Sequence, residues 1–171
     1  QDAHALVARL LAVNIPGWIG LEIDDALYIN RPSERWGHIY TPDLLAVAEQ
    51  PTAKIILPLR DYLYAEPLFG GLPDSCRVLL SEKYDIAQIM PGQSSKAVAL
   101  HYLMDSWGVS MDHVAAFGDD VNDVEMVEQA GLGVAMDNAV AEVKAVANRI
   151  TASNDDDGVA LVVEELLGMG A

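Results

Sequence analysis

The sequence contains little that would suit an oxidising compartment, a membrane or a nucleic acid. Cys76 is the only cysteine among 171 residues, so no disulfide can form within the chain. Lysine and arginine number 10 against 26 acidic residues, and the net charge of −16 argues against nucleic acid and anionic membranes as partners. No apolar run approaches the roughly 18 residues that a membrane-spanning helix needs. With no signal-peptide pattern at the N-terminus, we expect a soluble, cytoplasmic protein.

Apolar residues are plentiful, at 51% of the chain, so a sizeable core can form. The N-terminal part is predicted to mix helices at 3–13, 41–49 (with Thr41 as the N-cap) and 61–69 with strands at 18–23, 26–30, 54–59, 77–81 and 85–90. Pro91-Gly92 is a candidate boundary. Beyond it, helices and strands alternate, which is typical of a parallel α/β layer. The predicted helices there are 94–107, 121–129, 139–147 and one ending near 167, and the strands are 114–117, 132–135 and 149–151.

Four carboxylates fall within seven residues directly after the predicted strand 114–117: Asp119, Asp120, Asp123 and Glu125. This crowding is unfavourable without a positive partner, and a hard cation such as Mg²⁺ is the natural candidate. Asp119 follows the strand end by one glycine, where open parallel sheets bind ligands, so we interpret it as a metal ligand. Asp123 fits equally well as a carboxylate at a helix N-terminus, and we expect Asp120 and Glu125 to be solvated.

Lys96 breaks two local preferences. It lies in the first turn of its predicted helix, where the helix dipole disfavours a cation. It also shares the apolar stripe of that helix with Leu100, Leu103, Met104 and Trp107. Ordinarily, such a lysine lays its aliphatic stem along the apolar surface and extends its ammonium group into water. Beside a metal held by carboxylates, Lys96 would instead bind a phosphate by charge and neutralise those carboxylates.

Other candidate groups carry weaker signals. The acidic segment 154–158 is predicted to lead into a helix, because it lacks the alternating ligands of a calcium loop. The loop 31–40 is interpreted as an exposed connection, with a lid that contacts a leaving group as the sharper alternative. The histidines have no ligand spacing and are expected to be structural or at the surface: His4, His38, His101 and His113.

Five parts of the chain, taken in order, resemble the C-terminal half of a phosphatase of the haloacid-dehalogenase superfamily, in its Cof-type sugar-phosphatase branch: Lys96, 118–126, 131–139, 143–147 and 151–160. The resemblance implies an α/β fold, with a Rossmannoid parallel sheet formed by 91–171 and an inserted α+β cap formed by 1–90. It also implies Mg²⁺-dependent hydrolysis of small phosphorylated metabolites, sugar phosphates in particular, through an aspartyl-phosphate.

Carried over by position, the resemblance assigns four site residues. Asp119 would be the Mg²⁺ ligand and Asp123 its companion carboxylate. Asn122 would contact the phosphate or the substrate. Lys96 would be the catalytic lysine that binds the phosphate.

The family's N-terminal strand ends in Asp-x-Asp-Gly, whose first aspartate attacks phosphorus, and residues 1–90 contain no counterpart. The nearest approach there is Glu22-Ile23-Asp24-Asp25-Ala26, which lacks the glycine. The chain by itself is therefore predicted to be inactive. The strand 114–117 would also lack a neighbour, and open apolar edges recruit strands. We expect either self-association through that region or pairing with a missing N-terminal segment of a longer polypeptide.

Two other classes compete with the phosphatase. A non-catalytic binding module could pair with a partner that supplies the missing strands. The phosphorylation domain of a P-type cation pump has a similar Gly-Asp-x-x-Asn-Asp turn, but the lack of a spanning segment and the fit of 131–160 to the phosphatase branch argue against it.

Overall fold

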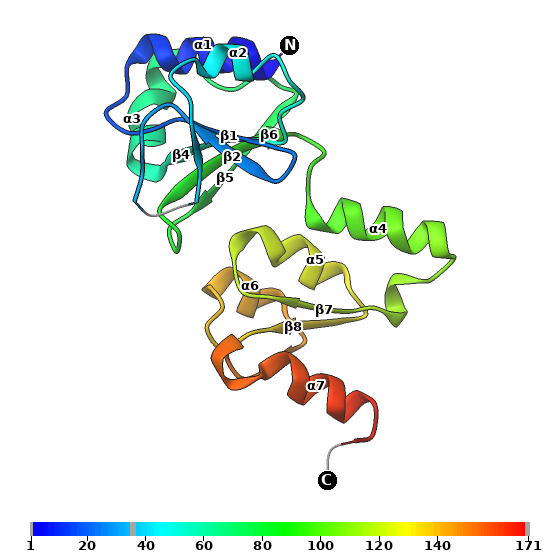
Figure 1. Cartoon of the computed structure of the whole chain (residues 1–171). Helices are drawn as coiled ribbons and strands as arrows, with labels where there is room; N and C mark the ends of the chain where they lie inside the picture. The colour runs from blue at the N-terminus through cyan, green and yellow to red at the C-terminus, as the bar shows by residue number, and fades with distance from the viewer. Residues whose placement is uncertain (1, 35–36, 170–171) are drawn as a thin grey trace. The chain divides into compact units, whose positions relative to one another are not determined.

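The computed structural model describes residues 2–34 and 37–169, and contacts divide the chain into two compact units, Gln1–Gln93 and Ser94–Ala171 (Figure 1). The division falls shortly after the Pro91-Gly92 boundary expected from the sequence. Each unit has its own sheet, with six strands in the first and three in the second. Within the described ranges, no helix is both long enough and apolar enough to cross a membrane.

The first unit builds a mixed sheet against helices. In sheet order its strands are β3 (Ile39–Tyr40), β2 (Ala26–Ile29), β1 (Gly20–Ile23), β4 (Lys54–Pro58), β6 (Ile86–Pro91) and β5 (Cys76–Ser81). Neighbouring strands are antiparallel except for β2 with β3. The helices are α1 (Asp2–Val13), α2 (Leu44–Val47) and α3 (Leu59–Phe69), and Figure 1 shows α1 and α2 side by side over the sheet.

The core of the first unit forms where α1 meets the sheet. Leu6, Val7 and Leu10 are fully buried, because residues three and four apart share one face of a helix. On the sheet, Leu21 and Leu57 are equally buried and belong to the same apolar cluster. The helical period predicted for the start of the chain is therefore confirmed.

The predicted start of the second helix was wrong by two residues. The side chain of Asp43, not of Thr41, caps α2 by accepting the backbone N–H of Ala46 at 3.1 Å. Thr41 instead continues the strand pairing, since its N–H donates to the carbonyl of Ile29 at 2.9 Å. Thr41 was a plausible cap by local sequence, but its backbone hydrogen bond to the sheet keeps it in the strand pairing.

The predicted loop 31–40 is tied to the fold at its first residue, and its last two residues form strand β3 instead of continuing the loop. The guanidinium of Arg31 donates to the carbonyl oxygens of Ile15 at 2.6 Å and Gly17 at 2.9 Å, and to the side chain of Asn14 at 3.2 Å. Arg31 therefore holds the chain that leaves α1, near the negative end of the helix dipole. Arg35 and Trp36, which the sequence placed in the same loop, lie outside the described residues.

The second unit is a parallel layer, as the alternating pattern predicts. Its strands are β7 (Ala115–Gly118), β8 (Leu132–Ala135) and β9 (Arg149–Ile150), in that order across the sheet. Its α-helices are α4 (Lys96–Trp107), α5 (Val124–Gln129), α6 (Ala141–Val146) and α7 (Gly158–Leu166). Figure 1 shows α5 and α7 on opposite sides of the strands. The predicted α/β fold with a parallel sheet is confirmed.

One glycine sets how closely α5 approaches β8. A Cβ on Gly133 would lie 2.0 Å from the carbonyl oxygen of Val127 in α5, so only glycine fits there. Val127 is fully buried, in one cluster with Ala135 and Val143. This close packing keeps the start of α5 next to the carboxyl ends of the strands.

Candidate functional site

The turn that follows β7 carries the acidic cluster. A Cβ on Gly118 would lie 2.5 Å from the Cβ of Asp123 and 2.8 Å from Cγ2 of Val127, so the chain can turn this tightly only at a glycine. The turn continues into a short 3₁₀ segment, η2 (Val121–Asp123), and then into α5. Asp119 and Asn122 are half-buried, at the carboxyl end of the parallel strands. This edge is where open α/β sheets bind their ligands.

Asp123 organises the turn from inside. Its side chain is 3% exposed, and its Oδ2 accepts the backbone N–H of Asp119 at 3.0 Å and of Asp120 at 3.2 Å. Its Oδ1 accepts a hydrogen bond from Nζ of Lys96 and forms an ion pair with it. A buried carboxylate needs such partners, since an unpaired one would be expensive to desolvate. Asp123 therefore acts both as a carboxylate at a helix N-terminus and as the ion-pair partner of Lys96.

Asp120 is buried, which contradicts its interpretation as solvated surface. It is 4% exposed and forms a capping box with Asp123: its side chain accepts the N–H of Asp123, while Asp123 accepts the N–H of Asp120. The crowding of carboxylates is thus partly resolved by backbone N–H groups rather than by cations. Local sequence gave no sign of this, because a cap and a solvated aspartate look alike there.

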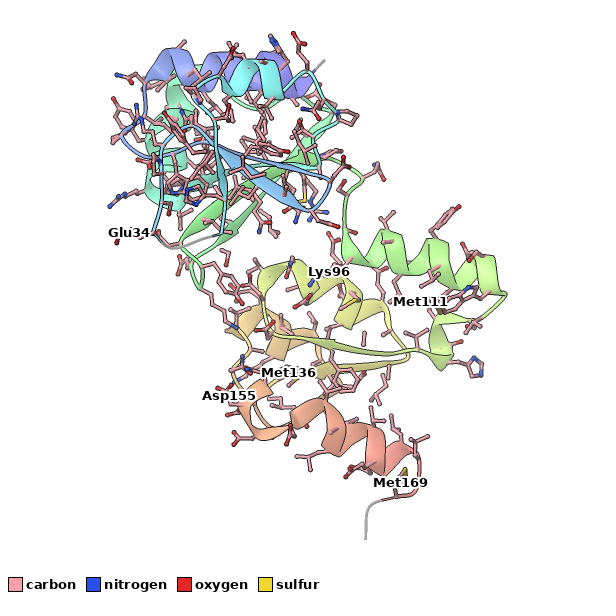
Figure 2. The ribbon with its side chains drawn as sticks, in the orientation of Figure 1. Glu34, Lys96, Met111, Met136, Asp155 and Met169 are labelled. Carbon is pink, nitrogen blue, oxygen red and sulfur yellow. The ribbon has the colours of Figure 1, made fainter. Side chains whose placement is uncertain are left out.

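Lys96 opens α4, directly after the N-cap Ser95, whose Oγ accepts the N–H of Val98 at 3.1 Å. Its side chain remains 48% exposed, whereas that of its partner Asp123 is 4% exposed. The ion pair is therefore open to solvent on the lysine side. The nearby carboxylate compensates the unfavourable helix dipole that made Lys96 unusual in the sequence. Figure 2 labels Lys96 at the start of α4.

The apolar stripe assigned to α4 is buried only in part among the described residues. Met104 of that stripe is buried, whereas Trp107 is 65% exposed and Leu103 39%. Ala97, outside the stripe, is also buried, so the helical period was correct and the buried face includes only part of the predicted stripe. Periodicity shows which residues share a face, and the neighbouring elements decide whether that face is covered.

A further side chain reaches Asp119 from the loop after β8. Nδ2 of Asn138 donates to Oδ2 of Asp119 at 3.4 Å, and the backbone N–H of Val140 donates to the carbonyl of Asp119 at 3.0 Å. Asn138 was not among the predicted site residues. Its position after a second parallel strand could have suggested it, because the carboxyl ends of neighbouring strands meet at one edge.

The other sequence candidates lie away from this edge or serve the fold. His101 contacts Gln129 at 2.8 Å. Asp155-Asp156-Asp157-Gly158 spells Asp-x-Asp-Gly, but its aspartates are exposed, its glycine begins α7, and it does not end an N-terminal strand. Ser153 caps the 3₁₀ turn that leads into α7 by accepting the N–H of Asp155 at 3.2 Å. The prediction of a helix-entry loop is confirmed.

The oxygen ligands at this edge suit Mg²⁺ better than a cation whose whole coordination shell must come from protein side chains. Among residues 2–34 and 37–169, no group of three or more His, Cys, Asp or Glu side chains converges on one point. Mg²⁺ keeps several waters and is commonly held by one or two carboxylates together with phosphate oxygens. The half-buried carboxylate of Asp119 fits such a site. Asp123 already accepts hydrogen bonds from two backbone N–H groups and from Lys96, so its role as a second metal ligand stays a prediction.

The comparisons with known proteins agree with this geometry. The family model of haloacid dehalogenase-like hydrolases matches residues 29–163. The chain therefore belongs to this family. It is 43% identical over 86 residues to the 5-amino-6-(5-phospho-D-ribitylamino)uracil phosphatase YitU of Bacillus subtilis, covering 50% of this chain and 32% of the relative.

Solved structures extend the likeness over almost the whole chain. A haloacid dehalogenase-like hydrolase from Bacteroides thetaiotaomicron superposes with a TM-score of 0.78 at 26% identity, covering 95% of this chain and 65% of that one. A sugar phosphatase of subclass IIB gives 0.77 at 18% identity, covering 99% and 66%. The resemblance to the haloacid-dehalogenase superfamily is thus confirmed, and the fold is shared with these structures. The chain spans about a third of YitU and just under two thirds of the matched structures.

Proposed function

We propose that this chain contributes the phosphate-binding and metal-binding half of a Mg²⁺-dependent phosphatase that acts on small phosphate esters, sugar phosphates in particular. The arrangement of Lys96, Asp123 and Asp119 at the carboxyl edge of the parallel sheet carries the proposal. It brings one cation, from the start of α4, to the turn that carries an accessible carboxylate. Membership of the hydrolase family and the phosphatase named among its relatives support the same reaction class.

Each residue has a distinct task in this proposal. Lys96, half-exposed and aligned by Asp123, would bind the phosphate through its ammonium group. Asn122, half-buried beside Asp123, would contact the phosphate or the rest of the substrate. Asp119 would hold Mg²⁺, with Asp123 as the companion carboxylate. When bound, Mg²⁺ supplies the positive charge that offsets the phosphate and the acidic turn.

The protein's own contribution is alignment before the reaction begins. The buried carboxylate of Asp123 fixes the backbone of the turn through two N–H groups and fixes the lysine through one ion pair. Groups held in place in this way need no rearrangement as charge develops on the transferring phosphoryl group. We propose further that the first unit is the cap that selects substrates, and that residues 91–171 are the second half of the core.

The aspartate that becomes phosphorylated is proposed to come from a segment outside these 171 residues, because no Asp-x-Asp-Gly ends an N-terminal strand here. The chain by itself would then be inactive. In the alternative, a non-catalytic module, the same open strand would pair with a partner without producing turnover. In the described part of the chain β7 pairs with β8 only, so both possibilities have a strand edge available.

Joining the chain to the N-terminal segment of a related phosphatase tests the proposal. Phosphate release from a panel of sugar phosphates should then require Mg²⁺, and Lys96→Ala should lower kcat/KM by about a hundredfold or more, the usual cost of removing one group that stabilises developing charge. The matched control is Lys54→Ala, which removes a lysine paired with Glu22 in the first unit and should leave kcat unchanged.

Two results would overturn the proposal. Turnover by the isolated chain would contradict the predicted inactivity. A folded fusion that binds phosphate esters without hydrolysing them would favour the non-catalytic module.

A further inference from the structure

The loop between β8 and α6 wraps around the backbone of the acidic turn. The N–H of Met136 donates to the carbonyl of Gly118 at 3.0 Å, and the N–H of Val140 donates to the carbonyl of Asp119 at 3.0 Å. These two hydrogen bonds lie on either side of Asn138 in the sequence. Backbone hydrogen bonds alone therefore hold the loop against Asp119.

Two bonds fix the orientation of the Asn138 carboxamide. Its Oδ1 accepts the backbone N–H of Asn154 at 3.2 Å, and its Nδ2 donates to Oδ2 of Asp119 at 3.4 Å. A backbone N–H can only donate, and an ionised carboxylate can only accept. The oxygen of the amide must then face Asn154, and the nitrogen must face Asp119. The network itself thus decides which end of the amide meets the carboxylate.

The backbone donor that orients Asn138 belongs to a well-fixed turn. The N–H of Gly158 donates to the carbonyl of Ser153 at 3.1 Å, and Oγ of Ser153 donates to the carboxylate of Asp156 at 2.6 Å. A Cβ on Gly158 would lie 2.1 Å from the carbonyl of Ala152, so this turn packs closely on the chain that leaves β9. Asn138 thereby connects Asp119 to the turn that opens α7.

We propose that Asn138 is a positioning residue, which holds the carboxylate of Asp119 in the orientation that binds a divalent cation. This inference rests on the proposed function of Asp119. A neutral amide donor suits the task, because it restrains one oxygen without cancelling the charge that attracts the metal. The bond to Asn138 narrows the rotamers open to this half-buried carboxylate, of which only some face the metal.

Manganese binding by the purified 171-residue chain tests this inference without measuring turnover. Mn²⁺ titrations followed by electron paramagnetic resonance should show an affinity about tenfold weaker in Asn138→Ala, at the lower end of the range for groups that orient metal ligands. The matched control is Asn154→Ala. Asn154 orients Asn138 through its backbone N–H, which the substitution keeps, while its side chain, among the described residues, forms a hydrogen bond only with Asp155. Its affinity should stay within about twofold of the unaltered chain.

The outcomes separate this inference from the proposed function. If the unaltered chain does not bind Mn²⁺, or if Asp119→Asn does not weaken binding, the metal site is overturned and this inference falls with it. If Asp119→Asn weakens binding but Asn138→Ala does not, only the positioning role is overturned. Thermal unfolding without metal should be the same for Asn138→Ala and the unaltered chain. A lower melting temperature together with weaker binding would assign Asn138 a structural role and overturn the inference.

Discussion

Asp61 is a buried carboxylate far in sequence from the proposed site. It lies in the first turn of α3, is 3% exposed, and its Oδ2 has no hydrogen-bond partner among the described atoms. Burial raises the pKa of this carboxyl above its ordinary value of 3.8, while Arg60 and the N–H of Gly17 oppose the shift. The unpartnered oxygen makes the charged form costly, because no donor replaces the water that it loses.

The raised pKa of Asp61 predicts a pH dependence of stability. Between pH 3.8 and the raised native value, the folded chain keeps a proton that the unfolded chain has lost. The free energy of unfolding of the first unit should therefore fall as pH rises through this window and stay lower above it. Asp61→Asn cannot ionise, so this part of the fall should disappear in urea titrations at a series of pH values.

The control for this measurement is Asp74→Asn, at an exposed position before β5. It should keep the fall in unfolding free energy seen in the unaltered chain. Equal pH profiles for Asp61→Asn and the unaltered chain would contradict the assignment to Asp61.

At single residues, the sequence indicated which side chains need a partner but not which partner they have. Asp119 and Lys96 were predicted as site residues because a charge is unfavourable at each position without a partner. The structure shows that Asp123 supplies the negative charge next to Lys96. The burial of Asp120 and the contact of Asn138 were missed. Both depend on backbone groups whose positions are set only when the strands and helices pack.

At the scale of elements, α1 offers a direct test of the core of the first unit. Leu10 is fully buried between α1 and its neighbours. Leu10→Ala should lower the free energy of unfolding by about 2–5 kcal/mol, from lost burial and the cavity left behind. Chemical denaturation followed by circular dichroism would measure the change.

The matched control is Leu63→Ala in α3, where the side chain is 54% exposed. Its effect should stay within about 0.5 kcal/mol. Similar losses for the two substitutions would mean that the buried face of α1 is not where the structure places it.

Elements were predicted well in type and less well at their ends. The strand pair β1 and β2, with its Asp24-Asp25 turn, and all three parallel strands were anticipated from period and turn residues. The start of α2 and the exposure of Leu103 and Trp107 in α4 were not. Both depend on residues distant in sequence. Thr41 is fixed by its hydrogen bond to β2, and the exposure of Leu103 and Trp107 depends on which elements pack on α4.

At the scale of the whole molecule, the second unit presents an open strand and exposed apolar side chains. In the described residues β7 pairs with β8 only, and Tyr102, Trp107 and Leu167 are each more than half exposed. Unpaired edges and contiguous apolar surface both favour association. We expect the isolated chain to self-associate, with a weight-average mass by light scattering that rises with concentration.

A charge on the edge strand should weaken that association. Ala115→Lys places a lysine on β7, at an exposed position, and should shift the rise in mass to higher concentration. Ala12→Lys adds the same charge at an exposed position of α1 in the first unit and should have no effect. A monodisperse monomer at all concentrations would rule out self-association and leave pairing with a longer polypeptide as the explanation to test.

The sequence by itself determined the family, the parallel layer after residue 91 and the strand-turn-helix segment that carries Asp119. The layer and the segment follow from local patterns of apolar residues, glycines and carboxylates, and the family from several such patterns in order between residues 96 and 160. Only the tertiary structure decided that Lys96 meets Asp123 and that Asn138 meets Asp119 and the N–H of Asn154. Those contacts join residues 16 to 27 positions apart, so they exist only where packing brings the carboxyl ends of the strands and the start of α4 together.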